Sequence, residues 1–105
     1  MDVSQRIKET VDSNRVMLFM KGNRDFPQCG FSGRAIQILQ ALGAEFETAD
    51  VLMDDEIRQG IKAFSNWPTI PQLYINGEFV GGSDIIMEMY ENGELKKSLS
   101  QTPAA

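Results

Sequence analysis

A strand, a helix and a second strand follow one another in the first half of the chain, and this succession constrains the fold more than any other feature. Residues 16–20 are five apolar residues in a row, a length that favours a buried strand over a helix. Residues 46–51 alternate loosely and predict a second strand. The segment between them has the i, i+3, i+4, i+7 spacing of one helix face, at Ala35, Ile38, Leu39 and Leu42. A helix of this length suits a crossover, so the pattern predicts a parallel βαβ unit and an α/β fold.

Further helices are predicted on either side of this unit. Residues 3–13 place an apolar side chain at every fourth position and predict an N-terminal helix. Another helix begins at residues 54–56, whose carboxylates suit the positive end of the helix dipole. Gly60 lies inside that helix without a local explanation, since glycine there costs about 1 kcal/mol relative to alanine.

The remaining residues are predicted to form a hairpin and a last helix. Asn76-Gly77 between two short apolar segments is the strongest short-range signal for a type I′ turn. Ser83-Asp84 can cap the helix that follows, Gly93 ends it, and a short extra turn precedes a tail, residues 100–105, that should fray. The elements together predict a single domain, residues 1–105, in which helices cover both faces of a small four-stranded mixed sheet.

Composition excludes several classes of function. The chain has no histidine, which removes the commonest metal ligand and general base and argues against zinc sites and Cys-His or Ser-His catalysis. A net charge of −5 without a basic stripe argues against nucleic-acid binding. No segment approaches the roughly 18 apolar residues of a membrane span, and a lone cysteine suggests a reducing compartment. We expect a protein that binds neither nucleic acid nor membrane, located in the cytoplasm or, as a mature form, in an organelle.

The lone cysteine, Cys29, lies between the first predicted strand and the helix that follows it. Unpaired backbone N–H groups point outward at a helix N-terminus, and the helix dipole favours negative charge there. A thiol at such a place ionises more easily, and the thiolate is the form that attacks disulfides and binds metals. The alternative is that Cys29 is a small buried apolar residue, the usual fate of a free cysteine.

Cys29 and Ser32 stand where a Cys-x-x-Cys redox motif would have two cysteines. Without a second thiol the chain cannot form an internal disulfide, so any oxidation must join Cys29 to a thiol from outside. Ser32 can donate a hydrogen bond toward the sulfur or merely help to cap the helix.

Three cations are candidates to bind an anionic ligand: Lys21, Arg58 and Lys62. Each could instead be a solvated surface charge. Arg58 could also pair with Asp54 or Asp55 on its own helix.

Two further segments have both a binding and a structural interpretation. Residues 81–84 form a second glycine-led helix start, which is either another anion site or a plain turn. The Ile70–Pro71 bond is either a cis peptide that frees the Ile70 backbone to pair with an extended peptide, or an ordinary trans bond. Trp67 could stack on a ligand or pack in the interior.

Three separated motifs resemble those of monothiol glutaredoxins of the CGFS type: Cys29-Gly30-Phe31-Ser32, Trp67-Pro68-Thr69-Ile70-Pro71 and Gly81-Gly82-Ser83-Asp84. The resemblance covers nearly the whole chain and follows the same order and spacing. It implies the thioredoxin fold with an extra N-terminal helix and a cis peptide bond before Pro71.

The resemblance also implies a groove for glutathione beside Cys29. Lys21 and Arg58 should meet the glycyl carboxylate, and the Ile70 backbone should pair with the cysteinyl unit. The γ-glutamyl end is expected at Gly82, Ser83 and Asp84. The other groove-lining residues should be Gly30, Phe31, Ser32, Lys62, Trp67, Thr69 and Pro71. Ser83 stands where many relatives have a second cysteine, so chemistry that needs that thiol is excluded.

The family implied by the resemblance binds a [2Fe-2S] cluster between two subunits. Such a cluster normally needs four thiolates, so two Cys29 thiolates and two glutathiones would complete it. We therefore expect a carrier that is a homodimer with cluster, a monomer without it, and a donor to iron–sulfur client or assembly proteins. One alternative is a glutathione-dependent oxidoreductase in which Cys29 attacks glutathionylated proteins. Another is a partner module that docks through the face around Cys29.

Overall fold

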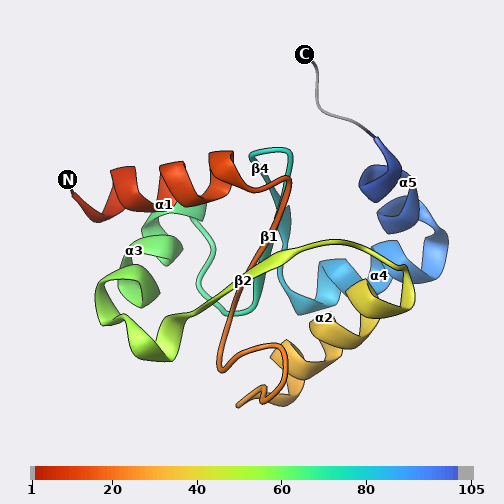
Figure 1. The fold of residues 1–105 in the computed structure, drawn as a ribbon, viewed down its shortest axis with the longest axis horizontal. Helices are drawn as coiled ribbons and strands as arrows, with labels where there is room; N and C mark the ends of the chain where they lie inside the picture. Colours follow the sequence, from red (N-terminus) through yellow and green to blue (C-terminus); the bar gives the residue numbers. More distant parts are fainter. Residues whose placement is uncertain (1, 102–105) are drawn as a thin grey trace.

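A computed structural model, which describes residues 2–101, contains the predicted four-stranded mixed sheet (Figure 1). Its strands are β1 (Val16–Met20), β2 (Glu47–Asp50), β3 (Gln72–Ile75) and β4 (Glu78–Gly81), in the spatial order β2-β1-β3-β4. Strands β1 and β2 are parallel, as the βαβ pattern predicts, whereas β3 is antiparallel to both of its neighbours. Asn76 and Gly77 both have positive φ, as a type I′ hairpin turn requires.

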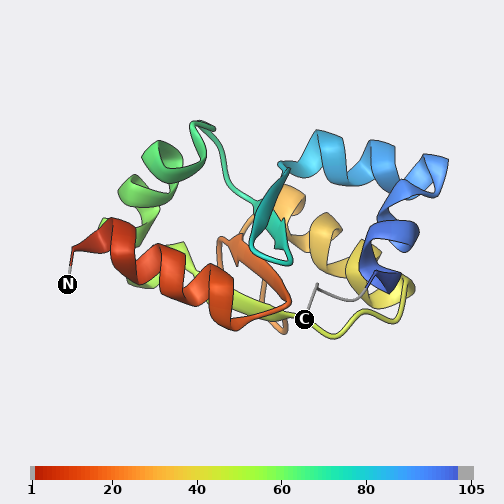
Figure 2. The same ribbon diagram turned by 90° about the horizontal axis from the view of Figure 1, so that it is seen from above.

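Helices cover both faces of this sheet (Figure 2). One face carries α1 (Val3–Ser13) and α3 (Asp55–Ser65), and the other carries α2 (Gly30–Ala41), α4 (Ser83–Asn92) and α5 (Glu94–Ser100). A short 3₁₀ turn, η1 (Val51–Met53), joins β2 to α3 and was not predicted. No helix within residues 2–101 is long and apolar enough to cross a bilayer.

The sheet separates two apolar cores, and β1 supplies both. All five of its residues are buried. Because successive side chains of a strand point to opposite faces, Val16, Leu18 and Met20 pack against α2, α4 and α5. Met17 and Phe19 pack in the core beneath α1 and α3. A fully buried strand explains why its sequence is a continuous apolar run rather than an alternating one.

Gly60 permits α1 and α3 to pack closely. A Cβ atom at this position would lie 3.0 Å from both Cγ atoms of Val3 and 3.2 Å from Cδ1 of Ile7. The structural reason for this glycine is therefore a contact with a helix about fifty residues earlier in the chain, which explains why its own neighbourhood gave no reason for it.

Two element ends differ from the predictions. The N-cap of α4 is Gly82, with no side-chain capping bond, so Ser83 and Asp84 are the first helical residues and do not cap the helix. Ser100, assigned from sequence to the fraying tail, is the last residue of α5, and its hydroxyl donates to the Lys96 carbonyl at 2.7 Å. The rest of that predicted tail after Gln101 lies outside the described residues.

Candidate functional site

Cys29 lies where a structured loop meets helix α2. It is the N-cap residue of α2, and its side chain is partly exposed, so the interpretation as a fully buried apolar residue is wrong. The loop before it is closed by a bridge between Gly22 and Pro27 and by a 2.9 Å bond from the Gln28 amide to the Lys21 carbonyl. The approach of the chain to Cys29 is thus fixed by backbone pairing.

Side chains from neighbouring elements hold the same loop in place. The Gly22 amide donates to Oδ1 of Asp50, at the end of β2, over 3.0 Å. The Arg24 guanidinium lies 4.4 Å from the centroid of the Phe46 ring and donates to the Phe46 carbonyl. Cys29 is therefore positioned by β1, β2 and α2 together.

The helix N-terminus favours the thiolate form of Cys29. The backbone N–H of Ser32 is the main group that lowers the pKa of the Cys29 thiol; partial burial opposes it, and the Phe31 N–H, the Lys21 charge and the Ser32 hydroxyl assist it. The thiol forms no capping hydrogen bond of regular geometry, so the two amides act as oriented dipoles that favour the charged form. Ser32 is fully buried, and its Oγ accepts a 3.0 Å bond from the Lys21 amide.

This lowered pKa makes a prediction about pH. Thiolate absorbance of the folded chain should titrate with a midpoint below that of the same chain in denaturant, and Lys21→Gln should move the folded midpoint upward. Between the two midpoints the unfolded chain holds a proton that the folded chain has lost. The free energy of unfolding should therefore rise with pH across that window, and this contribution should be lost as pH falls through the folded pKa. Equal midpoints in the folded and unfolded chain would remove the electrostatic argument for Cys29.

Cys29 borders a groove that contains most of the predicted ligand-binding residues. The cavity has a volume of about 480 Å³. Its lining residues come from the end of β1, the starts of α2 and α4, the outer face of α3 and the loop before β3: Lys21, Cys29, Phe31, Arg58, Lys62, Pro68, Thr69, Ile70, Ser83 and Asp84. Residues from five separated segments thus converge on the only thiol of the chain.

Five residues predicted for the groove do not line it. Gly30 lies on a second concave surface beyond Cys29, and Ser32, Pro71 and Gly82 are buried. The Trp67 ring packs 5.8 Å from the Phe79 ring, centroid to centroid, and its Nε1 would lie 2.7 Å from a Cβ at Gly82. All five are close in sequence to groove residues, but Gly30 is exposed outside the groove, Trp67 packs against Phe79, and the other three are buried.

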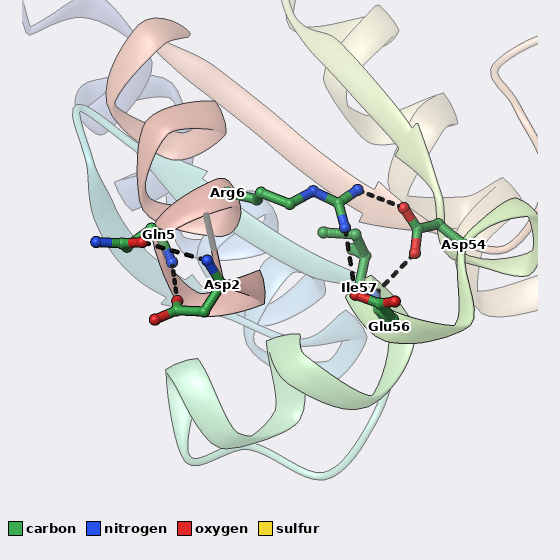
Figure 3. A network of polar contacts seen from close by, with 6 residues as sticks. All are labelled: Asp2, Gln5, Arg6, Asp54, Glu56 and Ile57. Atoms are coloured by element: carbon green, nitrogen blue, oxygen red, sulfur yellow. Dashed lines mark hydrogen bonds and ion pairs between the residues drawn. The ribbon is translucent and has the colours of Figure 1, made fainter.

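The groove has cations on one side and a carboxylate on the other. Across residues 2–101 no ion pair involves Lys21, Arg58 or Lys62. The predicted pairing of Arg58 with Asp54 or Asp55 is therefore not seen, and Asp54 pairs instead with Arg6 of α1 (Figure 3). That contact, followed by the Ile57 amide bond, lowers the pKa of Asp54.

Sequence reasoning missed the buried residue that shapes the loop before β3. Gln72 is fully buried, and its Nε2 donates to the carbonyls of Trp67 at 3.1 Å and Thr69 at 3.2 Å. Its Oε1 accepts a bond from Tyr74 Oη, whose pKa burial raises to about 12. The peptide bond from Ile70 to Pro71 is cis, as the resemblance implies. A glutamine at the start of a strand carries no sequence signal for this role.

The fold and the site define a class: a protein of thioredoxin fold with one free thiol at a helix N-terminus beside a cis-proline loop. The glutaredoxin family model matches residues 16–80. A monothiol glutaredoxin of Synechocystis sp., described as uncharacterized and ycf64-like, is 62% identical over 98 residues, which are 93% of this chain and 92% of that protein. The chain therefore belongs to the glutaredoxin family, among its monothiol members. Some monothiol relatives are longer, and the chain spans 20% of one from rice.

Solved structures agree with this assignment. The solution structure of reduced poplar apo GrxS14 superimposes with a TM-score of 0.79 at 52% identity, covering 90% of this chain and 87% of that one. A crystal structure of a buckwheat glutaredoxin–glutathione complex has a TM-score of 0.84 at 27% identity, covering 93% and 87%. The second of these relatives is one that binds glutathione.

Proposed function

We propose that the chain binds glutathione in the groove beside Cys29 and uses it to hold and deliver a [2Fe-2S] cluster. The observation that supports this most is the convergence on a single groove of one thiol with a lowered pKa and three cations that form no ion pair within residues 2–101. The glutathione complex of the buckwheat relative supports glutathione as the ligand.

The groove residues suit the two ends of this tripeptide. Lys21 and Arg58 would bind the glycyl carboxylate, with Lys62 nearby on the same helix face as Arg58. The Ile70 backbone would pair with the cysteinyl unit, which brings the glutathione sulfur toward Cys29. At the other end, Asp84 would accept hydrogen bonds from the γ-glutamyl ammonium group, and the N-terminal amides of α4 at Gly82 and Ser83 would bind its carboxylate.

The donor set of the chain fits a cluster shared between two copies. Residues 2–101 contain no group of three or more His, Cys, Asp or Glu side chains that could hold a metal ion, so one copy cannot supply a complete set. Two Cys29 thiolates and two bound glutathiones supply the four sulfurs that a [2Fe-2S] cluster normally needs. The cluster would be cargo: a homodimer carries it, iron–sulfur client or assembly proteins receive it, and the empty protein returns to a monomer.

Anaerobic reconstitution with iron, sulfide and glutathione tests this function. We expect a coloured species that elutes from a sizing column as a dimer and reverts to a colourless monomer when the cluster is lost. Reconstitution without glutathione should give no such species. A colourless monomer in the presence of all three reagents would contradict the carrier function.

Arg58 provides a test of the glutathione step by itself. Arg58→Gln should weaken glutathione binding by roughly 10- to 150-fold, because a hydrogen bond to a charged group contributes about 1.5–3 kcal/mol. Binding can be followed by NMR titration of the reduced, metal-free chain. Lys97→Gln, which removes an exposed cation from α5, is the matched control and should bind normally. An unchanged dissociation constant for Arg58→Gln would make Arg58 a plain surface charge.

A second candidate function uses the same thiolate, and the lowered pKa of Cys29 supports it. The Cys29 thiolate would attack the glutathione sulfur of a protein–glutathione disulfide, which forms a Cys29–glutathione disulfide and releases the protein thiolate. A second glutathione thiolate would then attack that disulfide, which regenerates Cys29 and releases oxidised glutathione. Rapid turnover of such a substrate, without a chromophore after reconstitution, would favour this function.

For either function we propose the cytoplasm as the location, since the lone cysteine suits a reducing compartment.

A further inference from the structure

Helix α1 contacts the start of α3, close to the groove cations, through Arg6. Nη2 of Arg6 donates to Oδ2 of Asp54 at 2.6 Å, and Nη1 lies 3.6 Å from Oε2 of Glu56 (Figure 3). Asp54 is the N-cap residue of α3, and its other oxygen accepts a bond from the Ile57 amide at 3.2 Å. One side chain of α1 therefore pairs with two carboxylates at the start of α3 and offsets part of their negative charge.

Without Arg6, Asp54 would have another cation within reach. Asp54, the N-cap residue, precedes Arg58 in the first turn of α3 by four residues, about one helical turn, so a released Asp54 carboxylate would lie at the same end of the helix as the Arg58 charge. Within residues 2–101 the Asp54 carboxylate is instead bonded to Arg6, 48 residues away in the sequence, and Arg58 forms no ion pair. Arg58 lines the groove instead, beside Lys62 of the same helix.

We propose that Arg6 is a positioning residue for ligand binding: by holding Asp54 it keeps Arg58 available to an anion in the groove. This inference rests on the proposed function, since it takes the glycyl carboxylate of glutathione as the ligand of Arg58. Loss of the Arg6 charge would act in two ways. It would free Asp54 to pair with Arg58, and it would leave uncompensated carboxylates that repel the incoming anion.

The apolar contacts of α1 allow Arg6 to be changed without losing the helix. Ile7 and Val11 are buried, at 0% and 1% exposure, and Val3 packs against Gly60. A reciprocal capping box between Asp2 and Gln5 also closes the start of α1 (Figure 3). The Arg6 and Asp54 side chains are 40% and 35% exposed, so their pair contributes little to stability itself.

Titration of the full, metal-free chain with S-methylglutathione, which has the carboxylates of glutathione but no thiol, tests this role. Arg6→Gln should raise the dissociation constant about two- to fivefold at low ionic strength, and the increase should fade in high salt because these charges are exposed. Adding Asp54→Asn to that variant should restore binding, since asparagine still caps α3 but carries no charge.

Lys8→Gln is the matched control. It breaks another exposed pair on α1, in which Lys8 Nζ lies 2.8 Å from Asp12 Oδ2, and it should leave the dissociation constant unchanged. If Arg6→Gln/Asp54→Asn binds as weakly as Arg6→Gln, Arg6 acts only as a structural bridge and the inference is wrong. If Arg6→Gln binds normally while Arg58→Gln binds weakly, the inference fails and the proposed function stands. If Arg58→Gln also binds normally, the assignment of Arg58 to glutathione fails first.

Discussion

Cys29→Ser is expected to abolish both cluster assembly and thiol–disulfide exchange while the chain remains folded. Cys29 is the only thiol in the sequence, so no other residue can supply the sulfur ligand or the nucleophile. Its side chain is only partly buried and makes no regular capping bond, and serine is a favourable N-cap residue. Anaerobic reconstitution should therefore give no visible chromophore and no dimer, whereas the thermal melt should stay close to that of the unmodified chain.

Met53→Leu is a suitable control for this variant. Met53 is 83% exposed, its sulfur is a thioether rather than a thiol, and it does not line the groove. This variant should assemble the cluster normally. Full cluster retention in Cys29→Ser would show that the sulfur ligand comes from elsewhere and would overturn the carrier proposal.

Gly22→Ala is expected to have the largest effect on stability among single substitutions near the site. Gly22 has φ of +86°, and a Cβ there would lie 2.5 Å from the Phe26 carbonyl oxygen and 2.6 Å from the Gln28 amide. Both are backbone atoms, so the bridge to Pro27 must open. We expect a loss of about 2–4 kcal/mol in the free energy of unfolding, from backbone strain together with overpacking. Chemical denaturation measures this loss, and the pKa of Cys29 should rise as the loop that carries Lys21 moves away.

Gly93→Ala separates the two causes. Gly93 also has φ of +86°, but a Cβ at this position has no neighbour within 4 Å. Gly93→Ala should lower the free energy of unfolding by about 1–2 kcal/mol, the range for a non-glycine residue in the left-handed conformation without a steric contact. The difference in the loss of unfolding free energy between Gly22→Ala and Gly93→Ala then measures the steric clash inside the loop. Equal losses would mean that the loop before Cys29 adapts freely to a side chain at position 22.

Local patterns in the sequence were sufficient to predict most of the elements. The apolar run of β1, the helical spacing of α2 and the Asn76-Gly77 turn each depend on neighbours within a few residues, and the structure contains all three. The motif around Cys29 likewise placed the thiol at a helix N-terminus. These features could be predicted because their causes, burial, periodicity and turn geometry, act over short distances along the chain.

Features that depend on distant contacts could not be predicted in the same way. Gly60 is explained by Val3, and Asp54, one of the two partners expected for Arg58, pairs with Arg6 instead. Gln72 holds the loop before β3 through bonds that no periodicity indicates. Within the groove, proximity in sequence was a poor guide to orientation: Thr69 lines it, whereas Trp67 packs behind it.

The groove takes its walls from both sides of the sheet. Arg58 and Lys62 belong to α3, which is anchored in one core by Ile61, whereas Phe31 and Ser83 begin helices anchored in the other core. A tripeptide bound there would contact helices from both layers and so connect two parts of the domain that have separate cores. Because such a ligand binds only the folded state, it would raise the free energy of unfolding of the whole domain. Saturation with glutathione should therefore raise the melting temperature of the metal-free chain.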